Sequence, residues 1–128
     1  MTLDAGSAVA ALALDLDLEA VADDQVVAGA PTTGSAALCT LGAVESGAVE
    51  SGAVEVSAVE IGVWEMTPGS MSDVESDEVF VVIAGRATVR FDHDGTVLHL
   101  GPGTVGRLAA GQCTVWTVTE TIRKVYIA

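Results

Sequence analysis

The residues best suited to chemistry form an acidic run in the second half of the chain: Asp73, Glu75, Asp77 and Glu78. Neighbouring carboxylates can move protons as general acid and base, or supply oxygen ligands to a hard cation. Glu78 differs from the other three because a period of two from it gives Phe80 and Val82, an apolar face. A carboxylate on that face would be partly desolvated, so we predict Glu78 as the catalytic candidate. The competing interpretation is that Glu78 pairs with a buried Arg or Lys, while the other three acids form a solvated loop.

The cysteines and histidines form no recognisable metal-binding or catalytic pattern. Cys39 and Cys113 lie in no C-x-x-C pair and near no clustered histidines, so the sequence predicts reduced, buried thiols and neither a zinc site nor a disulfide framework. His93 falls in a turn and His99 on a strand, where both are expected to be ordinary structural residues. We find no nucleophilic triad motif, phosphate-binding loop or Gly-x-Gly-x-x-Gly turn.

Length and charge limit the classes of protein. The 128 residues suffice for one domain, and 18 acidic against 5 basic residues give a net charge of −13. That charge repels phosphate backbones and anionic lipid, so we expect no nucleic-acid partner and no membrane partner. No apolar run reaches the roughly 18 residues of a membrane span, and the N-terminus lacks the basic segment of a signal peptide. The prediction is a soluble, cytoplasmic protein.

Residues 1–40 are predicted to be an acidic N-terminal extension, a strand or short helix plus loop, ahead of a domain over 41–128. Leucines at every second position from Leu12 to Leu18 favour a half-buried strand, although the surrounding alanines keep a helix open. The stretches 23–25 and 29–35 predict turns and a surface connection. From Gly42 a five-residue unit, first GAVES, recurs, and its first copies are expected to form a loop or strand edge.

Beyond Gly62 the chain consists of short runs rich in Val, Ile and Thr, separated by Gly, Pro and Asp turn signals. The predicted strands cover 63–66, 78–84, 87–91, 96–100, 104–108 and 114–127. Spacings of this kind are typical of antiparallel strands. The second half is therefore predicted to be an all-β sandwich or barrel.

Four segments give a more specific indication: GVWEMTPG (62–69), DEVFVVIAGRATV (77–89), LHLGPGTVGRLAAG (98–111) and TVWTVTETIRKVYI (114–127). Their order resembles the small single-domain cupins, and among these the (S)-ureidoglycine aminohydrolase and EutQ-like group. QVVAGAP (25–31) is similar to the segment that leads into that domain. The resemblance implies an all-β fold, a double-stranded β-helix (jelly-roll) barrel with an N-terminal extension.

Metal-dependent members of this superfamily place three histidines and a glutamate in the barrel through two motifs. In this sequence Glu78 and Gly85 match the end of the first motif, but Ser72 and Val74, or Met71 and Asp73 with the longer spacing, replace its histidines. Thr114 stands where the third histidine would be. One ligand of four remains, so we expect no standard metal site and no cofactor. Asp73 and Glu78 with an oxygen of Thr114 stay an alternative for Mg²⁺ or Ca²⁺.

The resemblance also implies which residues line the barrel. Thr114 and Trp116 would point inward with Phe80 and Val82, and Trp64 and Tyr126 are further candidate walls of a ligand pocket. Pure core packing is the competing interpretation for both tryptophans. On the last strand, the inward set is either Lys124 with Tyr126 or the alternate residues Arg123, Val125 and Ile127.

We therefore predict a homodimeric cupin barrel that binds a small polar metabolite without the standard metal. One alternative is an enzyme, similar to ureidoglycine aminohydrolase, that acts on a small nitrogenous compound with Glu78 as acid and base. The other is an acidic interaction or structural module, in which the N-terminal half contacts a basic partner protein.

Overall fold

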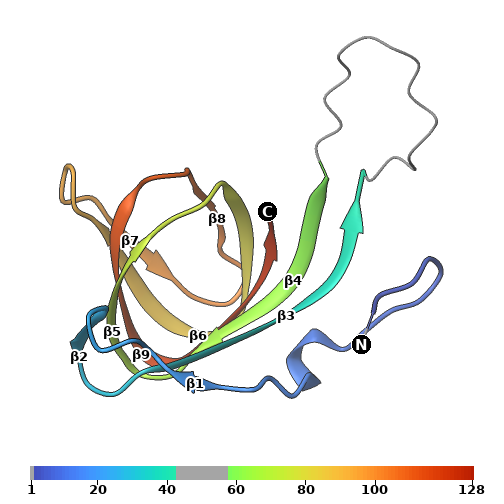
Figure 1. Ribbon diagram of the computed structural model, residues 1–128, viewed down its shortest axis with the longest axis horizontal. Helices are drawn as coiled ribbons and strands as arrows, with labels where there is room; N and C mark the ends of the chain where they lie inside the picture. Colours follow the sequence, from blue (N-terminus) through green and yellow to red (C-terminus); the bar gives the residue numbers. More distant parts are fainter. Residues whose placement is uncertain (1, 43–57) are drawn as a thin grey trace, which may run out of the picture.

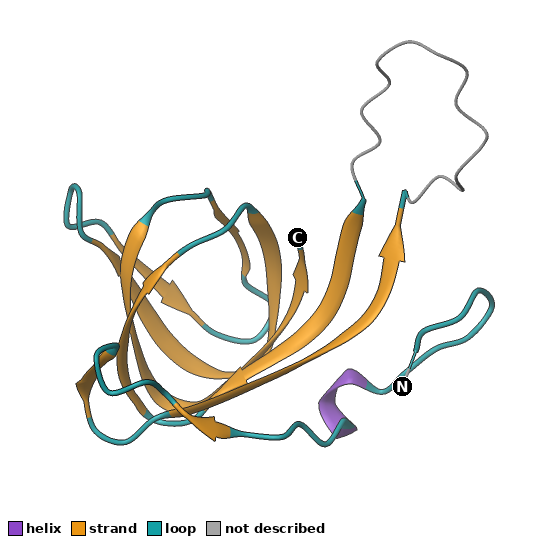
Figure 2. Cartoon of the chain, in the orientation of Figure 1, coloured by secondary structure: helices purple, strands orange, loops and turns teal. Residues whose placement is uncertain are grey.

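A computed structural model describes residues 2–42 and 58–128 of the chain. The first copies of the five-residue repeat, and the prediction made for them, lie outside the described residues. Figures 1 and 2 show strands that curl into a barrel, with residues 2–18 running along its outside. The all-β prediction is confirmed. Within residues 2–42 and 58–128, no helix has the length and hydropathy that crossing a membrane requires.

The described residues form one 3-10 turn and nine strands. They are η1 (Ala11–Ala13), β1 (Glu19–Ala20), β2 (Val26–Ala28), β3 (Thr32–Leu41), β4 (Val59–Met66), β5 (Gly69–Val74), β6 (Glu78–Phe91), β7 (Val97–Leu100), β8 (Val105–Leu108) and β9 (Cys113–Ile127). The order β1-β3-β4-β9-β5-β2 runs through the sheet, and β6 pairs with β7, β8 and β9. Every pairing is antiparallel.

Strand β9 organises the barrel because it is paired along both edges. Its first half pairs with β5, its second half pairs with β4, and β6 runs along nearly its whole length. Its sequence, TVWTVTETIRKVYI over 114–127, is rich in the β-branched and aromatic residues that pack well on a pleated surface. Side chains from three strands are therefore brought against the inner face of β9.

Strand β6 is continuous, whereas two separate runs were predicted on either side of Gly85. The register with β9 shifts between Val82 and Ala87, and Gly85 has a positive φ of 89°. A Cβ at Gly85 would overlap the carbonyl oxygen of Thr121, so glycine is required there. The bulge also switches the inward positions of β6 from even numbers to odd numbers, since Phe80 and Val82 are buried before it and Val89 and Phe91 after it.

The core fills the barrel interior, where seven apolar residues of the main core cluster are at most 1% exposed. They are Met66, Phe80, Val82, Val89, Leu108, Trp116 and Ile122. At roughly 1.5–3 kcal/mol for each fully buried large side chain, this set is the main source of stability. The inward period of Phe80 and Val82 that the sequence predicted is confirmed.

Several local predictions were wrong. Leu12 and Leu18 are 64% and 39% exposed, and the segment between them contains a 3-10 turn instead of a half-buried strand. Residues 32–35, expected in a surface connection, begin β3, where Thr32 pairs with Ala20 of β1 and residues 33–35 pair with β4. Strand β5 was not predicted at all. Residues 32–35 and β5 consist mostly of small and polar residues, so tertiary pairing decides their conformation.

Arg123 and a backbone hydrogen bond from Leu3 N–H to the carbonyl oxygen of Leu38 (2.8 Å) hold the N-terminal segment on the barrel. Arg123 Nη1 donates hydrogen bonds to the carbonyl oxygens of Ala11 (2.8 Å) and Leu14 (2.7 Å), while its Nε donates to Glu65 Oε1 at 3.0 Å. Strands β1 to β3 then add residues 19–41 to the sheet. The division of the chain into an extension and a domain at residues 40 and 41 stays a prediction.

Candidate functional site

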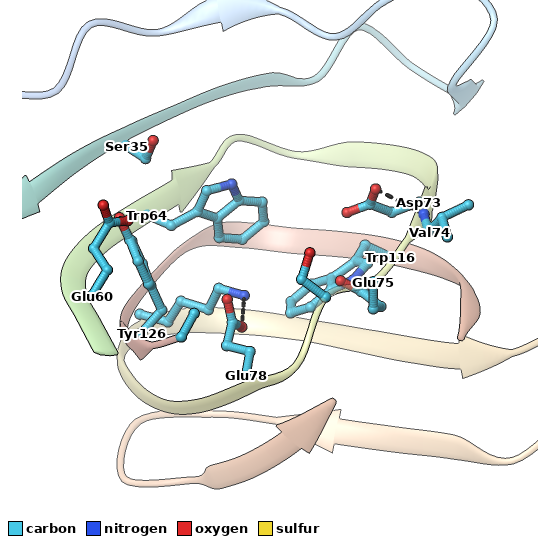
Figure 3. A pocket seen from close by; sticks show the side chains of 12 residues that line it. Ser35, Glu60, Trp64, Asp73, Val74, Glu75, Glu78, Trp116 and Tyr126 are labelled. Carbon is cyan, nitrogen blue, oxygen red and sulfur yellow. Dashed lines mark hydrogen bonds and ion pairs between the residues drawn. The ribbon is translucent and has the colours of Figure 1, made fainter. Parts of the chain in front are cut away.

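A cavity of about 350 Å³ lies inside the barrel and opens to solvent. Figure 3 shows its labelled side chains, which come from β3, β4, β5, β6, β9 and the link from β5 to β6. Acids and aromatic rings dominate the lining, and Lys124 is the one basic residue in it among the described residues. The composition of this cavity defines the candidate site.

Lys124 occupies the centre of the site. Its Nζ lies 2.6 Å from Glu78 Oε2, and the two side chains are 6% and 16% exposed. Three rings surround the same nitrogen, with centroids 4.7 Å away for Trp64, 4.8 Å for Phe80 and 4.8 Å for Trp116. The negative faces of aromatic rings attract a cation, so the rings and the carboxylate together stabilise a buried ammonium group.

Glu75, in the link from β5 to β6, forms hydrogen bonds with side chains of the barrel interior. Its Oε2 accepts a hydrogen bond from Thr114 Oγ1 at 2.7 Å and a second from Trp116 Nε1 at 2.9 Å. Thr114 and Trp116 are 0% and 1% exposed, so these bonds satisfy polar groups that are cut off from water. Glu75 is thereby held facing the cavity.

Asp73 lines the cavity from β5. Burial raises the pKa of its carboxyl, and the negative charge of nearby Glu75 raises it further. The backbone N–H of Val74, which donates to Asp73 Oδ1 at 2.9 Å, and the charge of Lys124 act in the opposite direction. The net pKa of Asp73 is above its ordinary value, as expected of a carboxyl among other acids.

Tyr126 and Glu60 form the remaining part of the lining. Tyr126 Oη donates a hydrogen bond to Glu60 Oε2 at 2.8 Å. Burial, this hydrogen bond and the charge of Glu60 raise the pKa of Tyr126 to about 12. Tyr126 lies opposite Gly62 on β4, where a Cβ would overlap the phenol, so the glycine makes room for the ring.

The geometry does not fit the metal that the fold family implies. Among the described residues, no group of three or more His, Cys, Asp and Glu side chains converges as metal ligands would. Thr114 donates to Glu75, and Glu78, the one ligand retained from the family's metal motifs, is already bound by the Lys124 ammonium. A site from Asp73, Glu78 and Thr114 for Mg²⁺ or Ca²⁺ stays a prediction.

The structure brings most of the predicted site residues together. Glu78, Trp64, Trp116 and Tyr126 line the cavity, and Asp73 joins them. Phe80, Val82 and Thr114 are fully buried behind that lining. The inward set of the last strand, which the sequence left open, is Lys124 with Tyr126.

The interpretation of three of the acids as a solvated loop was wrong for two of them. Asp73 lies on β5 and Glu75 bonds to buried side chains, so neither belongs to a solvated loop. Asp77 does face solvent, with its side chain 72% exposed and 3.4 Å from Arg107. The interpretation that Glu78 pairs with a buried basic residue is the one that the structure shows.

The predicted pocket left out three charged lining residues. Glu60 and Glu75 were not placed in the site, and Lys124 was considered as a partner for Glu78 and as part of one of two possible inward sets of the last strand. The parity that Lys124 shares with Tyr126 was a usable signal. No comparable signal marked Glu75, because its role depends on two side chains about forty residues away.

The histidines and cysteines lie elsewhere. His93 and His99 are exposed, and His93 Nε2 is 3.3 Å from Asp94 Oδ2 in the turn after β6. Both cysteines are free thiols, as expected, but the prediction that they are buried was wrong: Cys113 is exposed and Cys39 partly so. Each lies near a sheet edge or strand end, where the neighbouring strands leave the side chain uncovered.

Comparisons with known proteins agree with this architecture. Residues 55–126 match the model of the EutQ-like cupin domain. Among solved structures, a protein of unknown function from Pseudomonas syringae pv. tomato, of the DUF861 family, superposes with a TM-score of 0.68 at 24% identity. That alignment covers 93% of this chain and 46% of the other, so this chain spans about half the length of that relative.

Two further structures are similar. The EutQ protein of Clostridium difficile superposes with a TM-score of 0.57 at 20% identity over 76% of this chain and 67% of its own. A putative ethanolamine utilization protein Q from Salmonella typhimurium superposes with a TM-score of 0.55 at 14% identity, over 89% of this chain and 94% of its own. At these identities the likenesses establish the fold alone. No curated protein matches the chain in sequence.

Proposed function

This chain belongs to the EutQ-like cupin family, and from that premise we propose that it binds a small polar metabolite inside its barrel without a transition metal. The observation that carries the proposal is the cavity itself. Its volume of about 350 Å³ lies within the roughly 300–1,000 Å³ typical of small-molecule sites. A few convergent polar groups beside aromatic walls are the usual composition of such a site.

The metal-free part of the proposal is supported by the residues at the ligand positions. A transition metal needs at least three nitrogen, sulfur or carboxylate ligands of suitable geometry. Ser72, Val74 and Thr114 provide none of these, the longer spacing adds only Asp73, and Glu78 is paired with Lys124. Recognition then depends on hydrogen bonds, charge and ring contacts.

Intrinsic fluorescence tests the proposal directly, because the only two tryptophans of the chain, Trp64 and Trp116, both line the cavity. A screen of small amines, ureides, amides and carboxylates should include compounds that change the emission saturably and raise the melting temperature. Glu120→Gln, at an exposed position away from the cavity, is the matched control and should respond like the wild type. Failure of every compound in both assays would refute the proposal. So would near-stoichiometric Mn, Fe, Ni or Zn in protein purified without chelator.

A second candidate function is catalysis on a small nitrogenous compound. The observation that favours it is that Glu78 and Lys124 face the same cavity 2.6 Å apart, so a proton can pass between them and a bound substrate. Glu78→Gln should then abolish ammonia release from ureidoglycine while fluorescence still reports binding. Unchanged turnover in that variant would remove Glu78 as the proton carrier.

A further inference from the structure

We propose that the metabolite bound by this cavity is an organic cation, a compound with a primary ammonium or guanidinium group. The inference rests on the proposed function, because it specifies the ligand class of the same cavity. Two independent features of the site support it: an ammonium group that the barrel already holds, and a surplus of carboxylates around the remaining space.

The interior demonstrably accommodates an ammonium group. Lys124 is only 5% exposed as a residue, and the groups around its Nζ favour a positive charge. The rings of Trp64, Phe80 and Trp116 all lie within 4.8 Å of it. Trp64 and Trp116 also line the open cavity, so the surfaces that attract the lysine extend to where a ligand would lie.

The carboxylates of the cavity exceed its cations. Four acids line it, Glu60, Asp73, Glu75 and Glu78, against the single ammonium of Lys124. Lys124 is paired with Glu78. The hydrogen bonds received by the other three come from neutral donors: a phenol for Glu60, a backbone amide for Asp73, and a hydroxyl and an indole for Glu75.

The other basic residues of the chain do not relieve this surplus. The chain has four arginines, all within the described residues, and none of them lines the cavity. Arg123 is paired with Glu65, Arg107 with Asp77 and Arg90 with Asp92. An anionic ligand would meet uncompensated negative charge at short range, whereas a cationic ligand would neutralise it.

Asp73 and Trp64 mark where the cation would bind. Both also line an adjoining hollow of about 320 Å³ that extends to Glu19 and Gln25. Trp64 and Asp73 therefore line space on two sides. A cationic head group placed between Asp73, Glu75 and Trp64 has room for a short chain beyond it, and the crowding of Asp73 and Glu75 is relieved on binding.

A matched ligand series tests the charge preference: n-butylammonium, butyramide and butyrate, which share size and shape. Binding is measured at pH 7.5, on the full chain, by tryptophan fluorescence and by calorimetry. We expect n-butylammonium to bind at least about tenfold more tightly than butyramide, and butyrate to give no saturable signal. Asp73→Asn should weaken n-butylammonium binding severalfold, whereas Asp77→Asn, which removes a charge outside the cavity, should leave it unchanged.

Other outcomes separate this inference from the proposed function. Butyramide or butyrate binding as tightly as n-butylammonium would overturn the cation preference and leave the metabolite site intact. The same conclusion would follow if the broader screen found only neutral or anionic ligands. Equal weakening by Asp73→Asn and Asp77→Asn would show attraction to overall charge and also overturn the inference. If neither the three compounds nor any compound of the broader screen gives a binding signal, both proposals are refuted.

Discussion

The Nζ atom of Lys124 lies 2.6 Å from Oε2 of Glu78, although the two residues are not directly opposite in the sheet. The Cα partner of Lys124 on β6 is Val82, so the lysine side chain reaches along β6 to the carboxylate at its start. The one acid that survives from the family's metal-binding motifs is therefore matched by a cation from the chain itself. This pair neutralises Glu78, so the remaining charge of the cavity comes from Glu60, Asp73 and Glu75.

Removing the lysine should be costly. Lys124→Met keeps the length and apolar stem but leaves a half-buried carboxylate without its counter-charge, which costs about 3–5 kcal/mol in comparable buried pairs. We expect a loss of that order in the free energy of unfolding, measured by urea denaturation. In the double variant that also carries Glu78→Gln, a large part of the lost free energy of unfolding should be recovered. A double variant no more stable than Lys124→Met alone would show that the pairing is not the cause.

The raised pKa of Asp73 predicts a pH-dependent loss of stability. Burial is its first cause and the charge of Glu75 the second. The folded chain binds this proton more tightly than the unfolded chain, so stability falls as pH rises from the ordinary aspartate pKa, about 3.9, through the raised value. Asp73→Asn should therefore melt at a higher temperature than the wild type at pH 7. The gain should vanish near pH 3.

Asp77 provides the matched control with the opposite sign. Its pKa is lowered by the backbone N–H of Ala110 and by Arg107. Its ionised form favours folding above the ordinary pKa, and that contribution disappears as pH falls through the lowered value. Asp77→Asn should consequently melt slightly lower than the wild type at pH 7. Shifts of the same sign in both variants would contradict this assignment.

Tyr126 is the only tyrosine of the chain, so its ionisation can be followed alone by ultraviolet difference titration. The folded protein should titrate at about 12 instead of about 10, and folding should lose stability as pH rises across that interval. Glu60→Gln removes an adjacent negative charge and should lower the Tyr126 pKa, although burial keeps it above the ordinary value. Glu120→Gln, at an exposed position, should leave the titration unchanged.

Arg123 should control how firmly the N-terminal segment lies on the barrel. Charge-assisted hydrogen bonds contribute about 1.5–3 kcal/mol each, and Arg123→Met removes those to Ala11, Leu14 and Glu65. Amide hydrogen exchange at Leu3 and Ala13, whose N–H groups bond to Leu38 and Ala10, should accelerate at least about tenfold. Arg90→Met breaks only an exposed pair with Asp92 and should leave those amides protected.

The sequence was sufficient for the class of fold and for part of the inner wall. Period-two alternation placed Glu78, Phe80 and Val82 on one face, and the structure has Phe80 and Val82 fully buried with Glu78 lining the cavity. The motif order identified the family, which the domain match confirms. Both depend on local patterns, since alternation and turn residues report the conformation of a few consecutive residues.

Some predictions remain without a test. They are the homodimer, the cytoplasmic location, the likeness to ureidoglycine aminohydrolases, and the acidic N-terminal half as a contact for a basic partner. Each concerns a second molecule or a compartment, which neither the alternation of residues nor the pairing of strands within one chain determines.

Sequence alone determined that an acid would face the interior, and the tertiary structure decided which charge meets it. Lys124 and Glu78 are 46 residues apart, and the regular register of β6 on β9, which pairs Val82 with Lys124, sets their distance. In the same way Glu75 reaches Thr114 and Trp116 only once β5 has paired with β9. Ion pairs and hydrogen bonds act within about 4 Å in space, and no local pattern encodes which distant side chains come that close.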